Sequence, residues 1–220
     1  MVQTTKKVAA IMTAARYENT YCRNYIELAL KELGIPLTVS GGVFYGQCMQ
    51  KMLSDLCSHD CDYAVTVDGD SMFHAWQLQR MLSIVAQEEN IDALASMQVR
   101  RGAKAMLGSN GMNESVGWNG YPIKLKTAHF GLTVIDLAKL RQVPKPWFAA
   151  IPNEQGEWEG DKVDDDVHFW VQWELAGNSL YMDPGARIGH LEEMIVYFDE
   201  QMTPQHAYPA DWLKANASQV

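Results

Sequence analysis

The sequence has no apolar run long enough to cross a membrane. Its longest apolar runs, such as residues 8–12, fall far short of the ~20 residues that a spanning helix needs. Lys6 and Lys7 lie near the N-terminus, but the run of about 7–15 apolar residues that completes a secretory signal is missing. These absences predict a cytoplasmic protein that does not associate with a membrane.

Cysteine is also scarce, since the 220 residues include only Cys22, Cys48, Cys57 and Cys61. A disulfide framework is not expected in a chain of this size without an export signal. The last two cysteines flank His59 in a segment that could suggest zinc, but the spacing is not that of a finger or a ribbon. We therefore expect ordinary buried or half-buried thiols.

Basic residues are outnumbered, because 18 Lys and Arg stand against 27 Asp and Glu and give a net charge of −9. This balance argues against non-specific binding to a polyanion. Residues 99–145 have the opposite charge, since eight basic and two acidic side chains give this segment a net charge of +6. The rest of the chain therefore has a net charge of −15. Such a block could hold phosphates, and it could equally be a solvated basic surface.

Strand-like and helix-like segments alternate over the first hundred residues. Short runs rich in β-branched residues and alanine predict strands at residues 7–13, 37–39, 63–67 and 93–99. Apolar residues at helical spacing predict helices over residues 21–33, 47–57 and 76–87. This alternation implies a mostly parallel sheet that is covered by helices on both faces.

The second half of the chain is less regular. The glycine-rich stretch at residues 102–122 predicts a long loop, and the polar, proline-containing tail from residue 203 could wrap over the surface. Further elements are predicted as a strand at 130–135, a helix at 167–176, and short strands or turns at 180–182 and 187–189. The whole pattern predicts one α/β domain over residues 1–220.

The most informative motif is Asp68-Gly69-Asp70, which directly follows the apolar strand predicted at residues 63–67. In an open parallel sheet, ligands bind beyond the carboxyl ends of the strands. Two carboxylates on a tight turn can converge on one hard cation, and Mg²⁺ and Mn²⁺ prefer oxygen ligands. The alternative is a turn in which the aspartates only satisfy backbone donors.

Two further features carry chemistry later in the chain. Asp164, Asp165 and Asp166 lead into the predicted helix at 167–176, where acids are commonly caps and dipole partners. Three in a row exceed what capping needs, and crowded carboxylates raise one another's pKa, which suits a general base. His190 follows the last strand-like segment, and imidazole is a common metal ligand.

In this order, the three features resemble the nucleotide-sugar-dependent glycosyltransferases of the A-type fold. The resemblance covers roughly residues 7–192. It rests on Asp68-Gly69-Asp70 after its strand, on the strand from Phe130, on the acidic pair before the aromatic helix that includes Phe169-Trp170, and on Gly189-His190. It implies a single Rossmann-like, mostly parallel sheet, with a nucleotide-binding half at about 1–100, an acceptor-binding half at about 101–192 and a tail at 193–220.

The resemblance also implies roles for single residues. Asp70 and His190 would ligate Mn²⁺ or Mg²⁺, with Asp68 on the ribose or on a metal-bound water, and Asp166 would lie beside the acceptor hydroxyl. Asp165 stands where glutamate is commoner in the family, which leaves open which carboxylate acts. The residues expected at the nucleotide or its phosphates are Tyr17, Gln47 and Arg100.

The implied reaction has two electrostatic requirements that these residues meet. A bound dication neutralises the diphosphate leaving group as a Lewis acid, and a positioned carboxylate takes the proton of the acceptor hydroxyl. Arg101 and Lys104, which follow a predicted strand, could bind phosphate or acceptor. The aromatic residues Trp118, Trp147 and Phe148 could stack on a sugar or base, and could equally cap the core.

Three rival functions remain open. A phosphatase of the haloacid dehalogenase type would use Asp68 as its nucleophile, but that nucleophile normally ends the first strand, and here a complete strand and helix precede it. A sugar nucleotidyltransferase would need a glycine-rich first loop, and residues 13–17 contain no glycine. The third rival is a nucleotide- or sugar-binding module, which would keep the metal-binding turn Asp68-Gly69-Asp70 but carry out no reaction.

The expected donor is a uridine diphosphate sugar, the commonest donor in this family. The acceptor could be a saccharide or other small molecule, a protein, or a hydroxymethylated nucleic-acid base. Because the chain is acidic overall, a saccharide or small acceptor ranks first, and the basic block at 99–145 keeps nucleic acid open. The motifs do not predict the donor sugar or the oligomeric state.

Overall fold

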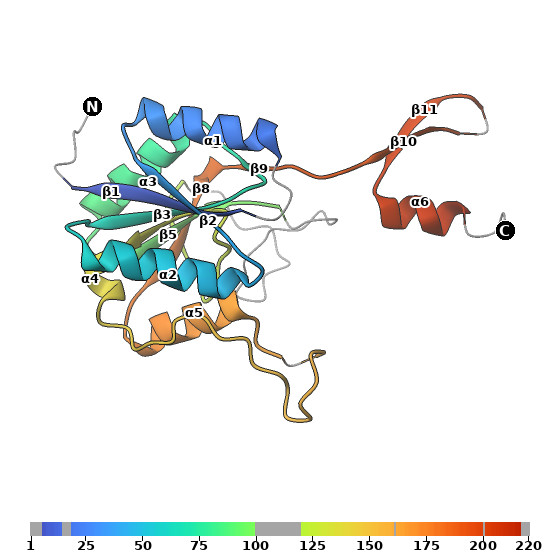
Figure 1. Cartoon of the computed structure of the whole chain (residues 1–220). Coiled ribbons are helices and arrows are strands. Elements are labelled where there is room, and N and C mark those ends of the chain that lie inside the picture. The colour runs from blue at the N-terminus through green and yellow to red at the C-terminus, as the bar shows by residue number, and fades with distance from the viewer. Residues whose placement is uncertain (1–5, 15–18, 100–119, 161, 200, 217–220) are drawn as a thin grey trace.

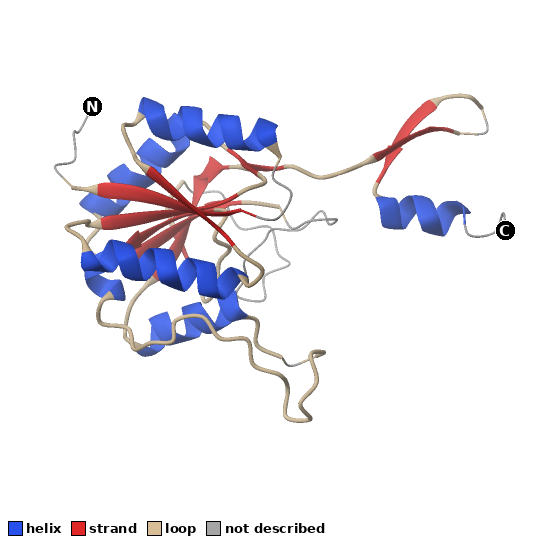
Figure 2. Ribbon diagram, viewed as in Figure 1, coloured by secondary structure: helices blue, strands red, loops and turns tan. Residues whose placement is uncertain are grey.

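The structure is a computed structural model that describes residues 6–14, 19–99, 120–160, 162–199 and 201–216. Its centre is a seven-stranded sheet with the strand order β2-β1-β3-β7-β5-β8-β6 (Figures 1 and 2). Five strands run in one direction: β1 (Val8–Ala14), β2 (Leu37–Gly41), β3 (Tyr63–Asp68), β5 (Ala93–Met97) and β8 (Leu180–Arg187). The predicted mixed α/β fold with a mostly parallel sheet is confirmed.

Two strands of the sheet run against the others. β7 (Leu132–Asp136) lies between β3 and β5 and is antiparallel to both, and the short β6 (Ile123–Lys124) is antiparallel to β8 at the edge. The sequence pattern predicted β7, as a strand at 130–135, but not its direction, since the residues of a fully buried strand are apolar in either direction. It did not predict β6.

Helices cover both faces of the sheet (Figure 1). One core cluster joins the sheet to α2 (Tyr45–Ser58), α4 (Leu137–Leu140) and α5 (Asp165–Leu175). The other cluster joins the opposite face to α1 (Thr20–Glu32) and α3 (Ala75–Gln87). Successive residues of the strands alternate between these clusters, as the period of two in a strand requires.

The helices begin close to their predicted starts. α1 begins after Asn19, whose side-chain oxygen accepts from the backbone N–H groups of Tyr21 and Cys22. α5 begins two residues earlier than predicted, so that Asp165 and Asp166 lie inside its first turn. This difference matters, because a helical first turn holds both carboxylates on a rigid element.

The C-terminal part of the chain departs most from expectation. Residues 180–182 and 187–189 were predicted as separate short pieces, but β8 runs unbroken to Arg187 and is followed by β9 (Gly189–His190), which pairs with β4 (Ser71–Met72). The tail does not wrap over the body. It forms a hairpin of β10 (Ile195–Phe198) and β11 (Pro204–Ala207) followed by α6 (Pro209–Asn216), and this arm extends away from the sheet (Figure 1).

Within the ranges that the structure describes, no helix combines the length and the apolar content that a membrane crossing requires. All four cysteines are free thiols, two of them buried and two half-buried, as predicted. The predicted loop at 102–122 lies almost entirely outside the described residues.

Candidate functional site

The side chains of Asp70 and His190 meet at the carboxyl edge of the sheet. The chain leaves β3 at Asp68, turns through Gly69 and Asp70, and enters β4, which pairs antiparallel with β9 in a register that sets Ser71 opposite His190. Asp70 Oδ2 lies 2.9 Å from His190 Nε2, and the two side chains are 30% and 11% exposed. Two groups 120 positions apart in the sequence thus share one half-buried site.

Backbone hydrogen bonds hold this pair in register. The N–H of Leu191 donates to the carbonyl of Asp70 at 2.9 Å, and the N–H of Ile188 donates to the carbonyl of Met97 at 3.0 Å. His190 is therefore tied on one side to the turn and on the other to the end of β5. Its position comes from the sheet and not from a mobile loop.

Asp68 and the acidic pair face a tyrosine that sequence reasoning did not identify. Burial raises the pKa of Tyr45 well above its usual range, and the nearby charges of Asp68, Asp166 and Asp165 raise the pKa further. Tyr45 is the first residue of α2. The charges of both acidic motifs therefore act on the phenol at the start of α2.

Asp166 is half-buried in the first turn of α5. Burial raises the pKa of its carboxyl, and the charges of Asp165 and Asp164 raise it further, against a hydrogen bond of 2.8 Å that the carboxylate accepts from the N–H of Val167. Asp164 occupies the N-cap position, but within the described chain its side chain makes no capping hydrogen bond and instead pairs with Lys162 at 2.8 Å. Asp165 and Asp166 accept from the backbone N–H groups of Asp166 and Val167, so these two acids serve the helix start and Asp164 does not.

Asp165 packs against the start of α2. A Cβ atom at Gly46 would lie 2.5 Å from Asp165 Oδ2 and 2.9 Å from Cβ of Phe148, closer than side-chain atoms approach one another, so only glycine fits there. The starts of α2 and α5 therefore lie against each other. The predicted residue Gln47, next to this contact, is exposed.

Aromatic packing anchors α5 and its acidic first turn. Phe169, Trp170 and Trp173 are each 1% exposed, and the ring of Phe130 stacks on Trp170 at a centroid distance of 5.2 Å. Trp147 is 2% exposed and donates its indole N–H to the carbonyl of Val143, so it belongs to the core and the sugar-stacking role is wrong for it. These aromatic residues hold the site rather than line it.

A buried polar layer supports the turn from behind. The N–H of Gly131 donates to Nδ1 of His129 at 2.9 Å, and Nε2 of His129 donates to the carbonyl of Ser96 at 2.9 Å. Burial lowers the pKa of His129 to about 4, so the imidazole is neutral at pH 7. A Cβ at Gly131 would collide with Gln98 and His129, and the carbonyl of Gly131 accepts from the N–H of Asp68. His129 and Gln98 were not predicted, because no motif marks them.

Helix α3 holds the end of β8, from which the chain continues to His190. Arg80 donates to both carboxylate oxygens of the fully buried Asp183, at 2.7 and 3.0 Å. Gln77 donates to the carbonyl of Arg187 and accepts from the N–H of His74. Because β9 starts two residues after Arg187, these bonds limit where His190 can lie.

Several predicted residues lie outside the described part of the chain. Tyr17 and Arg100 are among them, and so are Arg101, Lys104 and Trp118. Of the remaining predicted residues, Asp70 and His190 are in direct contact, and Gln47 is exposed at the start of α2. The charges of Asp68, Asp165 and Asp166 raise the pKa of Tyr45.

The donor set at Asp70 and His190 fits a divalent cation that a substrate completes. Among the described residues, no three His, Cys, Asp or Glu side chains converge closely enough to hold a metal ion by themselves, at this site or around Cys57 and Cys61. Mg²⁺-type ions, however, are commonly bound by one or two protein carboxylates together with substrate phosphates and water. One carboxylate and one imidazole, both partly exposed, match such a partial shell.

Many solved structures share this fold, and two of them follow. The crystal structure of A197 from STIV has a TM-score of 0.63 and 12% identity, over 90% of this chain and 92% of that one. The crystal structure of GalNAc-T7 with UDP, GalNAc and Mn²⁺ has a TM-score of 0.54 and 10% identity, over 86% of this chain but 43% of that one. No family model matches the sequence, and a search of curated proteins finds no match. At these identities the likeness shows the fold alone.

Proposed function

We propose that this protein is a metal-dependent glycosyltransferase that moves a sugar from a nucleotide diphosphate sugar, with UDP as the nucleotide, to an acceptor hydroxyl. The observation that carries the proposal is the 2.9 Å contact between Asp70 and His190 beyond the carboxyl end of β3. Ligands of open α/β sheets bind at that edge. The fold shared with GalNAc-T7, which was solved with UDP and Mn²⁺, supports the same reading.

In this proposal Asp70 and His190 hold Mn²⁺ or Mg²⁺, and Asp68 faces the ribose or a metal-bound water. When bound, the cation supplies Lewis-acid neutralisation of the diphosphate leaving group. Gln47, on the first turn of α2, contacts the nucleotide. Tyr17 and Arg100 keep the roles proposed for them at the nucleotide and its phosphates.

Asp166 is the proposed general base for the acceptor hydroxyl. Burial and the neighbouring carboxylates raise its pKa above that of an ordinary aspartate, and a base works best when its pKa approaches the working pH. Asp165 is the alternative base, but its carboxylate packs against Gly46. The buried aromatic residues of α5 fix the helix that carries both carboxylates. Binding of the acceptor therefore does not have to pay the entropy of ordering either side chain.

The acceptor class is proposed from charge. With a net charge of −9, the protein repels polyanions at long range, which favours a saccharide or another small acceptor over a hydroxymethylated nucleic-acid base. The charge gives no argument against a protein acceptor. A phosphatase with Asp68 as nucleophile is disfavoured by the topology, because Asp68 ends the third strand along the chain and β1 ends at Ala14.

Calorimetric titration with UDP, GDP and CDP, each with and without Mn²⁺, tests the proposal. We expect UDP to bind in the presence of Mn²⁺ and to lose at least about tenfold in affinity in Asp70→Asn, since a charged ligand of the cation is removed. Asp55→Asn, an exposed aspartate on α2, is the matched control and should bind as the unmodified chain does. Weak, metal-independent and equal affinities for the three nucleotides would overturn the proposal.

A further inference from the structure

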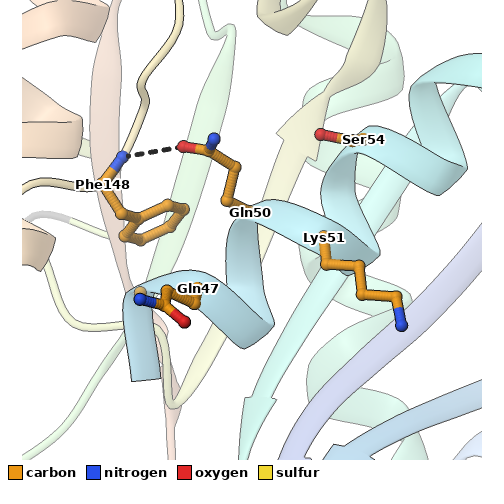
Figure 3. Close-up of a pocket in the computed structure, with 6 residues that line it drawn as sticks. Gln47, Gln50, Lys51, Ser54 and Phe148 are labelled. Carbon is orange, nitrogen blue, oxygen red and sulfur yellow. Dashed lines mark hydrogen bonds between the residues drawn. The ribbon is translucent and has the colours of Figure 1, made fainter. Parts of the chain in front are cut away.

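A shallow pocket of about 280 Å³ lies along the outer side of α2 (Figure 3). Phe148 and the start of α2 at Gly46 form one end of it. Four polar side chains of α2 line the rest, at positions i, i+3, i+4 and i+7 of one helix face: Gln47, Gln50, Lys51 and Ser54.

Two of the polar groups are held in place by the segment that follows α4. Gln50 Oε1 accepts from the backbone N–H of Trp147 at 2.8 Å and of Phe148 at 3.4 Å, so the amide nitrogen is the group that Gln50 presents (Figure 3). The ammonium of Lys145 donates to Ser54 Oγ at 2.9 Å and lies 4.7 Å from the centroid of the Trp147 ring. Lys145 is therefore fixed beside the Ser54 end of the pocket.

The pocket is locally cationic in an acidic protein. No carboxylate is among the residues that line it. Over the described chain, neither Lys51 nor Lys145 has a carboxylate within the 4.0 Å of an ion pair, although the protein carries nine more negative than positive charges. Amide donors, a hydroxyl and unneutralised ammonium groups are suited to an anionic group on a hydroxylated ligand.

The pocket starts beside Asp165, the alternative base. Its end at Gly46 is the position where a Cβ would lie 2.5 Å from Asp165 Oδ2, so this end adjoins the acidic first turn of α5. From Gly46 to Ser54 the helix rises about 12 Å, at about 1.5 Å per residue. A ligand with one hydroxyl beside the acidic turn of α5 can therefore extend along α2 toward Lys51 and Ser54.

We propose that this pocket is an acceptor subsite for an acidic saccharide, in which Lys51 and the Lys145–Ser54 pair bind a phosphate or carboxylate and the amide nitrogen of Gln50 binds a hydroxyl group. Its role as an acceptor subsite rests on the proposed glycosyltransferase function. Its ability to bind an acidic sugar does not, because the lining residues are complete without a nucleotide or a metal ion.

Chemical-shift mapping of the full chain, without nucleotide or metal, tests the subsite. The probes are glucose 6-phosphate, glucuronate, uncharged glucose and inorganic phosphate. We expect one or both of the acidic sugars to shift the backbone amides of residues 47–54 saturably, and Lys51→Gln to raise the Kd about fivefold, the effect of one partly exposed charge contact. The matched control Lys31→Gln, an exposed lysine of α1, should leave the Kd unchanged.

Each outcome decides the proposal. Glucose binding as tightly as the acidic sugars, inorganic phosphate binding as tightly as glucose 6-phosphate, or an unchanged Kd in Lys51→Gln would overturn the acidic-saccharide subsite. The calorimetry with UDP is independent of this mapping, so failure of the proposed function and failure of the subsite give different results.

Discussion

Asp166 is the side chain at which the proposed catalysis can be tested separately from nucleotide binding. Its carboxylate is half-buried, and its pKa is raised by burial and by two neighbouring carboxylates, whereas Asp70 and His190 lie at a different turn of the same edge. A change at Asp166 should therefore affect proton transfer without affecting the binding of the nucleotide.

We expect Asp166→Asn to keep the affinity for UDP and Mn²⁺ within about twofold and to lower the rate of sugar transfer by about 10²-fold or more, the usual contribution of a general base. Release of UDP from a UDP-sugar in the presence of an acceptor measures the rate, and Glu174→Gln at the far end of α5 is the control. If the unmodified chain and Asp166→Asn both bind the UDP-sugar and neither releases UDP, the protein is a binding module without turnover; equal release from both would rule out Asp166 as the base.

His129 makes the stability of the fold depend on pH. Its pKa is about 4 in the folded chain, mainly because of burial, against about 6.5 for an unperturbed imidazole. Between these values the unfolded chain binds more protons than the folded chain. The stabilising contribution is therefore complete above about pH 6.5 and is lost as the pH falls toward 4, by roughly 3 kcal/mol.

We expect urea unfolding between pH 7 and pH 4 to show this loss in the unmodified chain, and His129→Gln to remove most of that pH dependence. Glutamine keeps an amide donor and an acceptor but does not titrate. His206→Gln, at an exposed position of the arm, is the control and should leave the pH dependence unchanged. If the free energy of unfolding falls equally with pH in His129→Gln and in the unmodified chain, His129 is not the source of the pH dependence.

At the scale of elements, the contact between α3 and β8 determines where the chain reaches His190. Asp183 is fully buried, and its charge is compensated by the two hydrogen bonds from Arg80. Removing one partner of such a pair leaves an uncompensated buried charge, which costs much more than the pair itself contributes.

We expect Arg80→Met to lower the free energy of unfolding by about 3 kcal/mol, because Asp183 is left without its partner. Adding Asp183→Asn should recover part of this loss. Lys6→Met is the control, since it removes the Lys6–Asp62 pair, whose side chains are 52% and 39% exposed, and should cost less than about 1 kcal/mol. Chemical denaturation measures the free energy of unfolding of the three variants. Equal losses of that free energy in Arg80→Met and Lys6→Met contradict the expectation.

At the scale of the whole molecule, the C-terminal arm at residues 194–216 is separate from the body (Figure 1). Its packing is internal, with Tyr197 against Trp212 at a ring distance of 6.5 Å, while Val196 and Phe198 on the other side of the hairpin are 67% and 63% exposed. A two-stranded hairpin with one short helix contributes little stability to a sheet that it does not touch.

We expect removal of residues 194–220 to change the Tm of the body by less than about 2 °C and to leave UDP binding with Mn²⁺ unchanged. Thermal unfolding and the calorimetric titration measure the two effects. Removal of residues 189–220, which includes His190 and β9, is the comparison and should abolish the metal-dependent binding. A fall in Tm of about 5 °C or more on the shorter truncation would show that the arm supports the body.

Local pattern was enough to predict the elements and the motifs at their ends. The period of the apolar residues identified the strands and helices of the first hundred residues to within a few positions, because that period reflects the regular geometry of the backbone. Asp70, Asp166 and His190 could be selected for the same reason, since each lies at the end of an element that its own neighbours in the sequence predict.

Contacts between distant segments required the three-dimensional structure. The antiparallel insertion of β7, the effect of three carboxylates on the pKa of Tyr45, and the neutral His129 have no local signal in the sequence. Sequence periodicity specifies which face of an element is apolar, but strand order and the packing of loops specify which element it meets. For that reason the sequence alone identified the acidic residues and the histidine. The pairing of β4 with β9 in the folded chain is what brings Asp70 Oδ2 and His190 Nε2 to 2.9 Å.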